Sequence, residues 1–275
     1  MIFDLHSHST ASDGVLSPPE LVARAAQQGV NVLALTDHDE IKGVSDARAA
    51  AAELDIDLVA GVEISTTWAG RTIHIVGLRV DPEHPVLLEG LRINRSGRRD
   101  RAQRMADALA GVGIPGAMQG AMQLAANDEL ISRTHFARFL VEKGYVKNLK
   151  TVFKKFLVRG KPGYVSHQWA SLADALAWIH QAGGVAVLAH PGRYEMGKEK
   201  MSLLMAEFKE LGGEAIEVVT GSHTPDQVPI FAAYAERYDL LASVGSDFHA
   251  PGEGGRELGR LMPLPECCRP VWQDW

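Results

Sequence analysis

The sequence predicts an α/β fold in which mostly parallel strands alternate with helices and close into a barrel. Short apolar runs such as Val30 to Leu35 and Val185 to Ala189 are typical of buried strands, and segments with helical periodicity lie between them. Six or seven such strand–helix units fit the chain, and this number favours a barrel. The length of 275 residues is that of one large domain, with or without an insertion.

The first part of the chain contains two strand–helix units and a hairpin. Ser17 caps a helix that begins with prolines and ends at Gly29, and Ala69-Gly70 is a turn that joins two further strands. The expected order is strand 2–5, helix 18–28, strand 30–35, helix 44–54, and strands 58–60 and 72–76.

The alternation resumes after Pro162. The expected order is helix 172–181, strand 185–189, helix 202–211, strand 215–219, helix 226–237 and strand 240–244. Residues 91–164 are helical and interrupt this order, so we expect residues 1–90 and 165–275 to form the barrel and residues 91–164 to form a helical insertion.

Composition limits the classes of partner. The net charge of −6 argues against bulk affinity for duplex DNA, although it allows a local basic site. Cys267 and Cys268 are the only cysteines, the start lacks a signal-peptide pattern, and there is no apolar run of about 18 residues. We therefore expect a cytoplasmic protein that does not enter the membrane and has no obligate protein partner.

Histidines and carboxylates gather at the ends of the predicted strands. His6 and His8 close the first strand, where residues two apart point the same way and can reach one ion. A single buried histidine is usually a core residue, but this shared position has no packing explanation and predicts a metal centre at the catalytic face of the barrel. The full set is His6, His8, Asp13, His38, Glu63 (which ends the third predicted strand), His74 (inside a strand), His190, Asp247 and His249.

This series of motifs resembles the polymerase-and-histidinol-phosphatase (PHP) family of metal-dependent phosphoesterases. The motifs follow the family order from residue 1 to about 250. The resemblance implies a distorted (β/α)7 TIM-like barrel with two or three divalent ions. The matching motifs are His6-x-His8, Asp13, Thr36-Asp37-His38, Glu63, His74, His190-Pro191 and Asp247-Phe248-His249.

The resemblance also implies how the ligands are shared. The first ion would be held by His6, His8, Glu63 and Asp247, and the second by Asp13, His38 and His249. Glu63 would bridge to a third ion held by His74 and His190. Asp13 stands where some relatives have histidine, which favours a harder ion such as Mn²⁺ or Mg²⁺ over Zn²⁺ at the second site. Mn²⁺ is the expected ion, although Mg²⁺, Zn²⁺ and Fe²⁺ stay open.

The expected chemistry is attack on a phosphate ester by a metal-bridging hydroxide, which requires no serine or cysteine nucleophile. We assign His38, Asp247 and His249 to catalysis. Asp247 would be a terminal metal ligand, and His38, His249 or a metal-bound water would protonate the leaving oxygen.

The insertion is expected to select the substrate. Its arginines form either a solvated helix face or a site for a second phosphate, and Thr134 either caps a helix or helps to bind an anion. The predicted substrate contacts are Asp13, His38, Arg99, Asp100, Arg101, Arg133, Thr134, His135, Arg193, His223 and His249.

The arginine-rich helix followed by Arg133-Thr134-His135 resembles the TrpH-like branch of the family. That resemblance implies removal of the 3′-phosphate from nucleoside 3′,5′-bisphosphates, which leaves a 5′-mononucleotide. The alternatives are 5′-to-3′ trimming of short RNA at the same site, hydrolysis of a small phosphomonoester such as histidinol phosphate, and a non-catalytic nucleotide-binding module.

Overall fold

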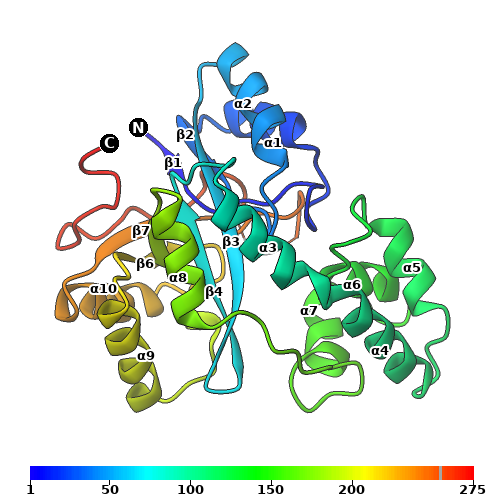
Figure 1. Ribbon diagram of the computed structural model, residues 1–275. Helices are drawn as coiled ribbons and strands as arrows, with labels where there is room; N and C mark the ends of the chain where they lie inside the picture. Colours follow the sequence, from blue (N-terminus) through cyan, green and yellow to red (C-terminus); the bar gives the residue numbers. More distant parts are fainter. Residues whose placement is uncertain (254–255) are drawn as a thin grey trace.

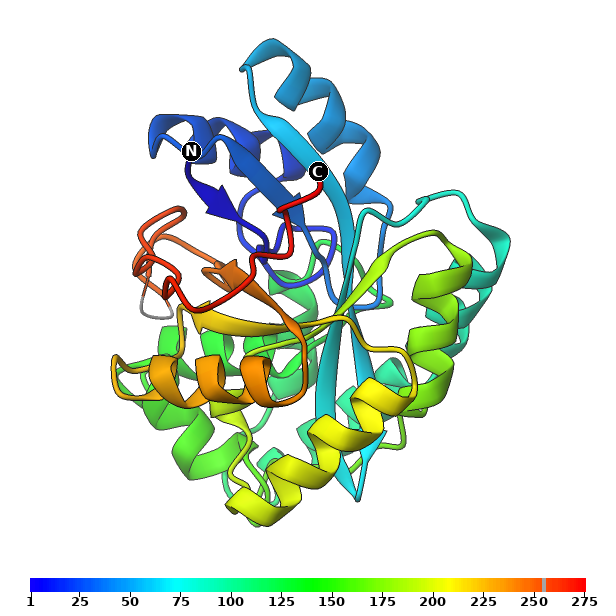
Figure 2. The ribbon, with the colours of Figure 1, turned by 90° about the vertical axis from the view of Figure 1, so that its left-hand side faces the viewer.

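The computed structural model describes residues 1–253 and 256–275, and within them seven strands form one nearly closed barrel (Figures 1 and 2). The strands lie in sequence order, and the N–H of Leu5 donates to the Val244 carbonyl at 3.0 Å, which joins the first strand to the last. The distorted α/β barrel predicted from the sequence is confirmed. The strands are β1 (Phe3–Asp4), β2 (Val32–Leu35), β3 (Asp57–Trp68), β4 (Arg71–Leu78), β5 (Val185–Leu188), β6 (Ala215–Thr220) and β7 (Leu241–Gly245).

Strands β3 and β4 form a long antiparallel hairpin, and β4 is also antiparallel to β5, whereas the other pairs are parallel. The expected turn is confirmed, since Ala69 and Gly70 both have positive φ, as a tight two-residue turn requires.

The prediction that Glu63 ends its strand is wrong. Strand β3 pairs with β2 only as far as Ala60 and then continues along β4, so Glu63 lies in its middle, beyond the end of β2.

Five helices alternate with the strands as predicted, and each buries one apolar stripe against the barrel. In α1, for example, Leu21, Val22 and Ala25 are fully buried. The helices are α1 (Pro18–Gln27), α2 (Gly43–Glu53), α8 (Leu172–Gln181), α9 (Lys198–Glu210) and α10 (Gln227–Arg237). None of the helices described is both long and apolar enough to cross a membrane.

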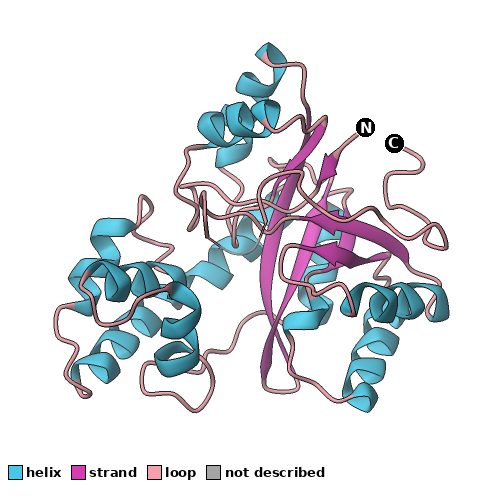
Figure 3. Cartoon of the chain, turned by 180° about the vertical axis from the view of Figure 1, so that it is seen from behind, coloured by secondary structure: helices cyan, strands magenta, loops and turns pink. Residues whose placement is uncertain are grey.

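Most of the chain between β4 and α8 forms helices that extend to one side of the barrel (Figure 3). Helix α3 (Pro85–Ser96) continues through residue 91, where the insertion was expected to begin. Its Leu87 and Leu91 belong to the barrel core. The helices that follow it share a separate apolar cluster that includes Phe136 and Leu157. They are α4 (Arg98–Ala110), α5 (Ala117–Leu124), α6 (Arg133–Glu142), α7 (Leu149–Val152) and a π-helical turn at Phe153–Leu157.

Close packing between α3 and α8 makes Gly90 sensitive to substitution. A Cβ added at Gly90 would lie 2.3 Å from Cδ2 of Trp178. We expect Gly90→Ala to lower the free energy of unfolding by about 1–3 kcal/mol, because the indole must move. The control Gly111→Ala places its Cβ 3.4 Å from the nearest atom, at φ −60°, and should change stability by less than about 0.5 kcal/mol. Equal urea midpoints for the two variants would contradict this account of the packing.

Candidate metal centre and adjoining cavity

Four side chains from three parts of the barrel converge on the first candidate metal site. His6 and His8 follow β1, Glu63 comes from β3 and Asp247 follows β7. The His6 and His8 Nε2 atoms are 3.1 Å apart, and both lie 3.3 Å from Oε2 of Glu63. Ligand atoms bound to a tetrahedral ion at about 2.0–2.1 Å stand about 3.3 Å apart, so this spacing fits one divalent ion.

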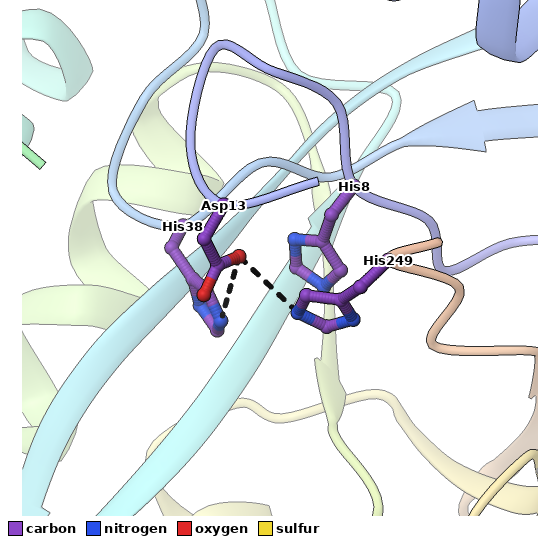
Figure 4. A group of neighbouring side chains, drawn as sticks. All are labelled: His8, Asp13, His38 and His249. Carbon is purple, nitrogen blue, oxygen red and sulfur yellow. Dashed lines mark ion pairs between the residues drawn. The ribbon is translucent and has the colours of Figure 1, made fainter. Parts of the chain in front are cut away.

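A second group lies beside the first and shares His8 with it (Figure 4). Oδ1 of Asp13 lies 3.2 Å from Nε2 of His249 and 3.9 Å from Nε2 of His38. The four residues come from three loops that follow β1, β2 and β7, so the barrel brings together side chains far apart in the sequence.

The third group lies on the other side of Glu63. Its Oε1 is 2.7 Å from Nδ1 of His74 and 2.8 Å from Nε2 of His190. His38, Glu63 and His74 also lie close enough to offer ligand atoms to one ion. The structure thus brings all nine predicted metal ligands into one cluster around Glu63, and their assignment to individual ions stays a prediction.

The carboxylates of this cluster have the donor atoms that a cation requires. In Asp13, Glu63 and Asp247, the oxygen that faces the cluster makes no hydrogen bond to any described residue, although it is buried. Buried polar atoms are normally satisfied, so these three oxygens require an explanation. An ion between them supplies one, and the residues present therefore fit divalent metal binding.

The pKa values of Glu63 and His8 agree with metal binding. Burial raises the pKa of Glu63, but the imidazoles of His38 and His74 outweigh burial and hold it well below its usual range. Burial, together with the His249 and His38 rings, lowers the pKa of His8 to about 3. At neutral pH Glu63 is therefore anionic and His8 neutral, which are the forms that bind metals. Burial lowers the pKa of His249, but the neighbouring carboxylates outweigh burial and raise it to about 9, so an ion bound there would displace a proton.

Glu217 on β6 supports the centre and was not predicted from the sequence. Its Oε1 lies 2.6 Å from Nδ1 of His6, and its Oε2 accepts the N–H of His190 at 2.6 Å. A proton on Nδ1 of His6 leaves Nε2 free for the ion. The available signal was a carboxylate inside the otherwise apolar strand Ala215 to Val219.

Asp37 supports the loop that carries Asp13 and was also missed as a site residue. It accepts hydrogen bonds from the hydroxyls of Ser9 and Ser12, both at 2.6 Å, and from the N–H of Ser9 at 2.8 Å. These bonds fix the loop between His8 and Asp13. The sequence signal was its position next to His38.

A cavity of about 560 Å³ adjoins the metal centre and extends towards the insertion. Asp13, His38 and His249 line it at one end. Arginines and aromatic rings line the rest of it, which combines positive charge with flat apolar surface. These residues are Arg98, Arg101, Arg133, Arg193, Phe153 and Trp169.

Two predicted substrate contacts on α4 lie away from the cavity. Arg99 and Asp100 are exposed and do not line the cavity, whereas Arg98 and Arg101 are buried and do. The reason is helix phase, since positions 98, 101, 102 and 105 share the face of α4 that packs inward. Arg98 pairs with Asp39, next to His38, and was not among the predicted contacts.

Of the other predicted contacts, Arg133, Thr134 and Arg193 line the cavity, but His135 and His223 do not. Nδ1 of His135 accepts the N–H of Ser132 at 3.1 Å, which caps α6. The His223 ring lies 3.0 Å from both the N–H of Gly192 and the carbonyl of Val218, so its two nitrogens are occupied by backbone. Both histidines are buried structural residues in this fold.

A barrel that carries such a centre at the ends of its strands defines a metal-dependent hydrolase. The PHP domain model matches residues 4–218, and the chain belongs to the PHP domain family. It is 54% identical to a 3′,5′-nucleoside bisphosphate phosphatase of Chromobacterium violaceum, over 98% of this chain and 95% of that protein. It is 46% identical to the 5′-3′ exoribonuclease Rnm of Escherichia coli, over 100% of this chain and 94% of the relative.

A solved structure of an amidohydrolase from Chromobacterium violaceum, with bound sulfate, has the same fold. Its TM-score is 0.97 at 52% identity, and the match covers 100% of this chain and 95% of that one.

The contact between Glu217 and His6 predicts an effect on metal affinity. Glu217→Gln should weaken binding of one Mn²⁺ equivalent by about 10- to 100-fold, because His6 loses the carboxylate that orients its ring. The control Glu214→Gln, whose carboxylate accepts the Ala186 N–H at 2.7 Å outside the centre, should bind Mn²⁺ like wild type. Calorimetric titration of metal-free protein measures both. Identical isotherms for Glu217→Gln and wild type would exclude this role.

Proposed function

We propose that the protein is a metal-dependent phosphatase that removes the 3′-phosphate of nucleoside 3′,5′-bisphosphates and releases 5′-mononucleotides. The observation that carries this proposal is the cationic cavity beside the metal centre. Arg101 and Arg133 line it, and neither forms an ion pair with a carboxylate in residues 1–253 and 256–275. Burial, together with Arg133 and Arg98, lowers the pKa of Arg101 to about 9. Guanidinium groups crowded in this way favour an anionic ligand.

The proposed substrate matches the two ends of the cavity. A 3′-phosphate at the metal centre leaves the 5′-phosphate to Arg101 and Arg133, while Phe153 and Trp169 offer apolar surface to the nucleoside. The 54% identical relative is named a 3′,5′-nucleoside bisphosphate phosphatase, which supports the same substrate.

Divalent ions in the centre, with Mn²⁺ the proposed one, would supply the Lewis acidity that makes water a nucleophile near neutral pH. His6, His8, Glu63 and Asp247 would hold the first, Asp13, His38 and His249 the second, and Glu63, His74 and His190 the third. Arg193, which donates to Oδ2 of Asp247 at 2.7 Å, would contact phosphoryl oxygens. His38 and His249 line the cavity and are the candidates to give a proton to the leaving 3′-oxygen.

The second candidate is 5′-to-3′ trimming of short RNA at the same centre. Relatives from Haemophilus influenzae and Escherichia coli, 48% and 46% identical, are named 5′-3′ exoribonucleases. A 5′-phosphate on Arg101 and Arg133 would place the next phosphodiester at the metals.

We also propose a cytoplasmic location, with which the two unpaired cysteines agree. The proposed partners are nucleotides or RNA ends, not duplex DNA.

The cavity arginines predict a substrate-dependent loss of activity. Arg101→Met and Arg133→Met should lower kcat/KM for adenosine 3′,5′-bisphosphate by about 10- to 150-fold, because a charge-assisted contact to the 5′-phosphate is lost. Adenosine 3′-monophosphate, which lacks that phosphate, should be affected far less. The exposed Arg99→Met on the same helix is the control and should leave both substrates unchanged.

Steady-state assays with Mn²⁺ measure these effects, with histidinol phosphate and a short 5′-phosphorylated RNA as competing substrates. Equal losses on the bisphosphate and the monophosphate would contradict the second-phosphate site. Faster turnover of histidinol phosphate than of the bisphosphate would replace the proposal with a small-metabolite phosphatase. Binding without turnover of any substrate would leave a nucleotide-binding module.

A further inference from the structure

The start of helix α6 contacts a candidate metal ligand of the barrel. The Ser132 hydroxyl donates to Oδ2 of Asp13 at 2.7 Å, and Nη1 of Arg138 donates to the Asp13 carbonyl at 2.7 Å. Arg138 is held in turn by two bonds to Glu253, at 3.0 and 2.8 Å. Asp13, Ser132 and Arg138 are all buried, and a hydrogen bond in such surroundings is electrostatically stronger than one in water.

The two carboxylate oxygens of Asp13 therefore have different surroundings. Oδ1 faces His38 and His249 (Figure 4), whereas Oδ2 accepts the Ser132 hydroxyl. The bond to Ser132 fixes the rotation of the carboxylate and aims Oδ1 at the candidate second ion. A hydrogen bond of this kind orients a metal ligand.

The same turn of α6 also forms a wall of the cationic cavity. Ser132, Arg133 and Thr134 line the cavity, and the Ser132 hydroxyl oxygen accepts the N–H of Thr134 at 3.0 Å. A ligand that binds Arg133 and Thr134 thus contacts the turn that orients Asp13. The first site differs, because His6 is oriented by Glu217 of the barrel itself.

We propose that Ser132 and Arg138 are positioning residues that couple the cavity to the second metal site through Asp13. A 5′-phosphate that binds at the start of α6 and a metal ion that binds at Asp13 would each strengthen the binding of the other. Such coupling is reciprocal, so each ligand must raise the affinity for its partner by the same factor. The identity of the ligand rests on the proposed function, whereas the effect on metal binding does not.

Mn²⁺ titration of metal-free protein without nucleotide tests the first part. Ser132→Ala should weaken one equivalent by about 10- to 100-fold and leave the remaining equivalents unchanged. Ser132→Thr, which keeps the hydroxyl, should restore that equivalent. Ser171→Ala is a matched control, because Ser171 caps α8 with the same hydroxyl chemistry, accepting the N–H of Asp174 at 3.1 Å, but does not touch the centre. An unchanged isotherm for Ser132→Ala, or an equal weakening of every equivalent, would overturn the proposal.

Titration with adenosine 5′-monophosphate, which carries only the 5′-phosphate, tests the coupling. Mn²⁺ should tighten its binding to wild type by a larger factor than its binding to Ser132→Ala. Equal factors in both proteins would overturn the coupling. An absence of nucleotide binding in wild type would overturn it as well and would count against the proposed function, while a selective metal defect in Ser132→Ala would still establish Ser132 as a positioning residue.

Discussion

The Glu63 carboxylate lies within 3.3 Å of ring nitrogens of five histidines, although none of its surface is exposed. A buried charge is costly unless it is surrounded by compensating groups, so the rest of the centre must be held in place around it. Strand β3 runs past the end of β2 and carries this carboxylate. Strand β4 and the loops after β1, β2 and β5 supply the imidazoles.

The barrel supplies the candidate metal ligands, and helices α4 and α6 supply much of the cavity wall. Within the barrel, Glu217 contacts the ring of His6, and Asp37 holds the loop that carries Asp13. Helices α4 and α6 supply Arg98, Arg101 and Arg133 to the cavity wall. The same two helices contact the centre at two acidic loops, through Arg98 on Asp39 and Ser132 on Asp13. A centre that cleaves phosphate esters can in this way be limited to substrates with a second phosphate, because remote binding energy aligns the scissile ester.

Much of the metal centre could be predicted from the sequence. Histidines and acidic residues follow the apolar segments that form the strands, and this pattern is visible along the chain without knowledge of the tertiary contacts. The middle position of Glu63 could not be predicted, since the length of β3 is set by its pairing with β4. The inward face of α4 could be predicted only to within one residue, because four arginines in its first seven residues obscure the apolar stripe that fixes its phase. The backbone contacts of His135 and His223 could not be predicted either, because a histidine has the same sequence signature whether it binds a ligand or the backbone. Glu217 was missed since a strand pattern reveals burial but not partners.

A crystal structure of the Mn²⁺-loaded protein with adenosine 5′-monophosphate, with anomalous data at the manganese edge, would locate both the ions and the 5′-phosphate. We expect anomalous peaks among the His6, His8, Glu63 and Asp247 donors and beside Asp13. We also expect the 5′-phosphate on Arg101 and Arg133, with the 3′-hydroxyl towards the metals. A 5′-phosphate bound at the manganese ions, with the arginines unoccupied, would contradict the proposed orientation of the substrate.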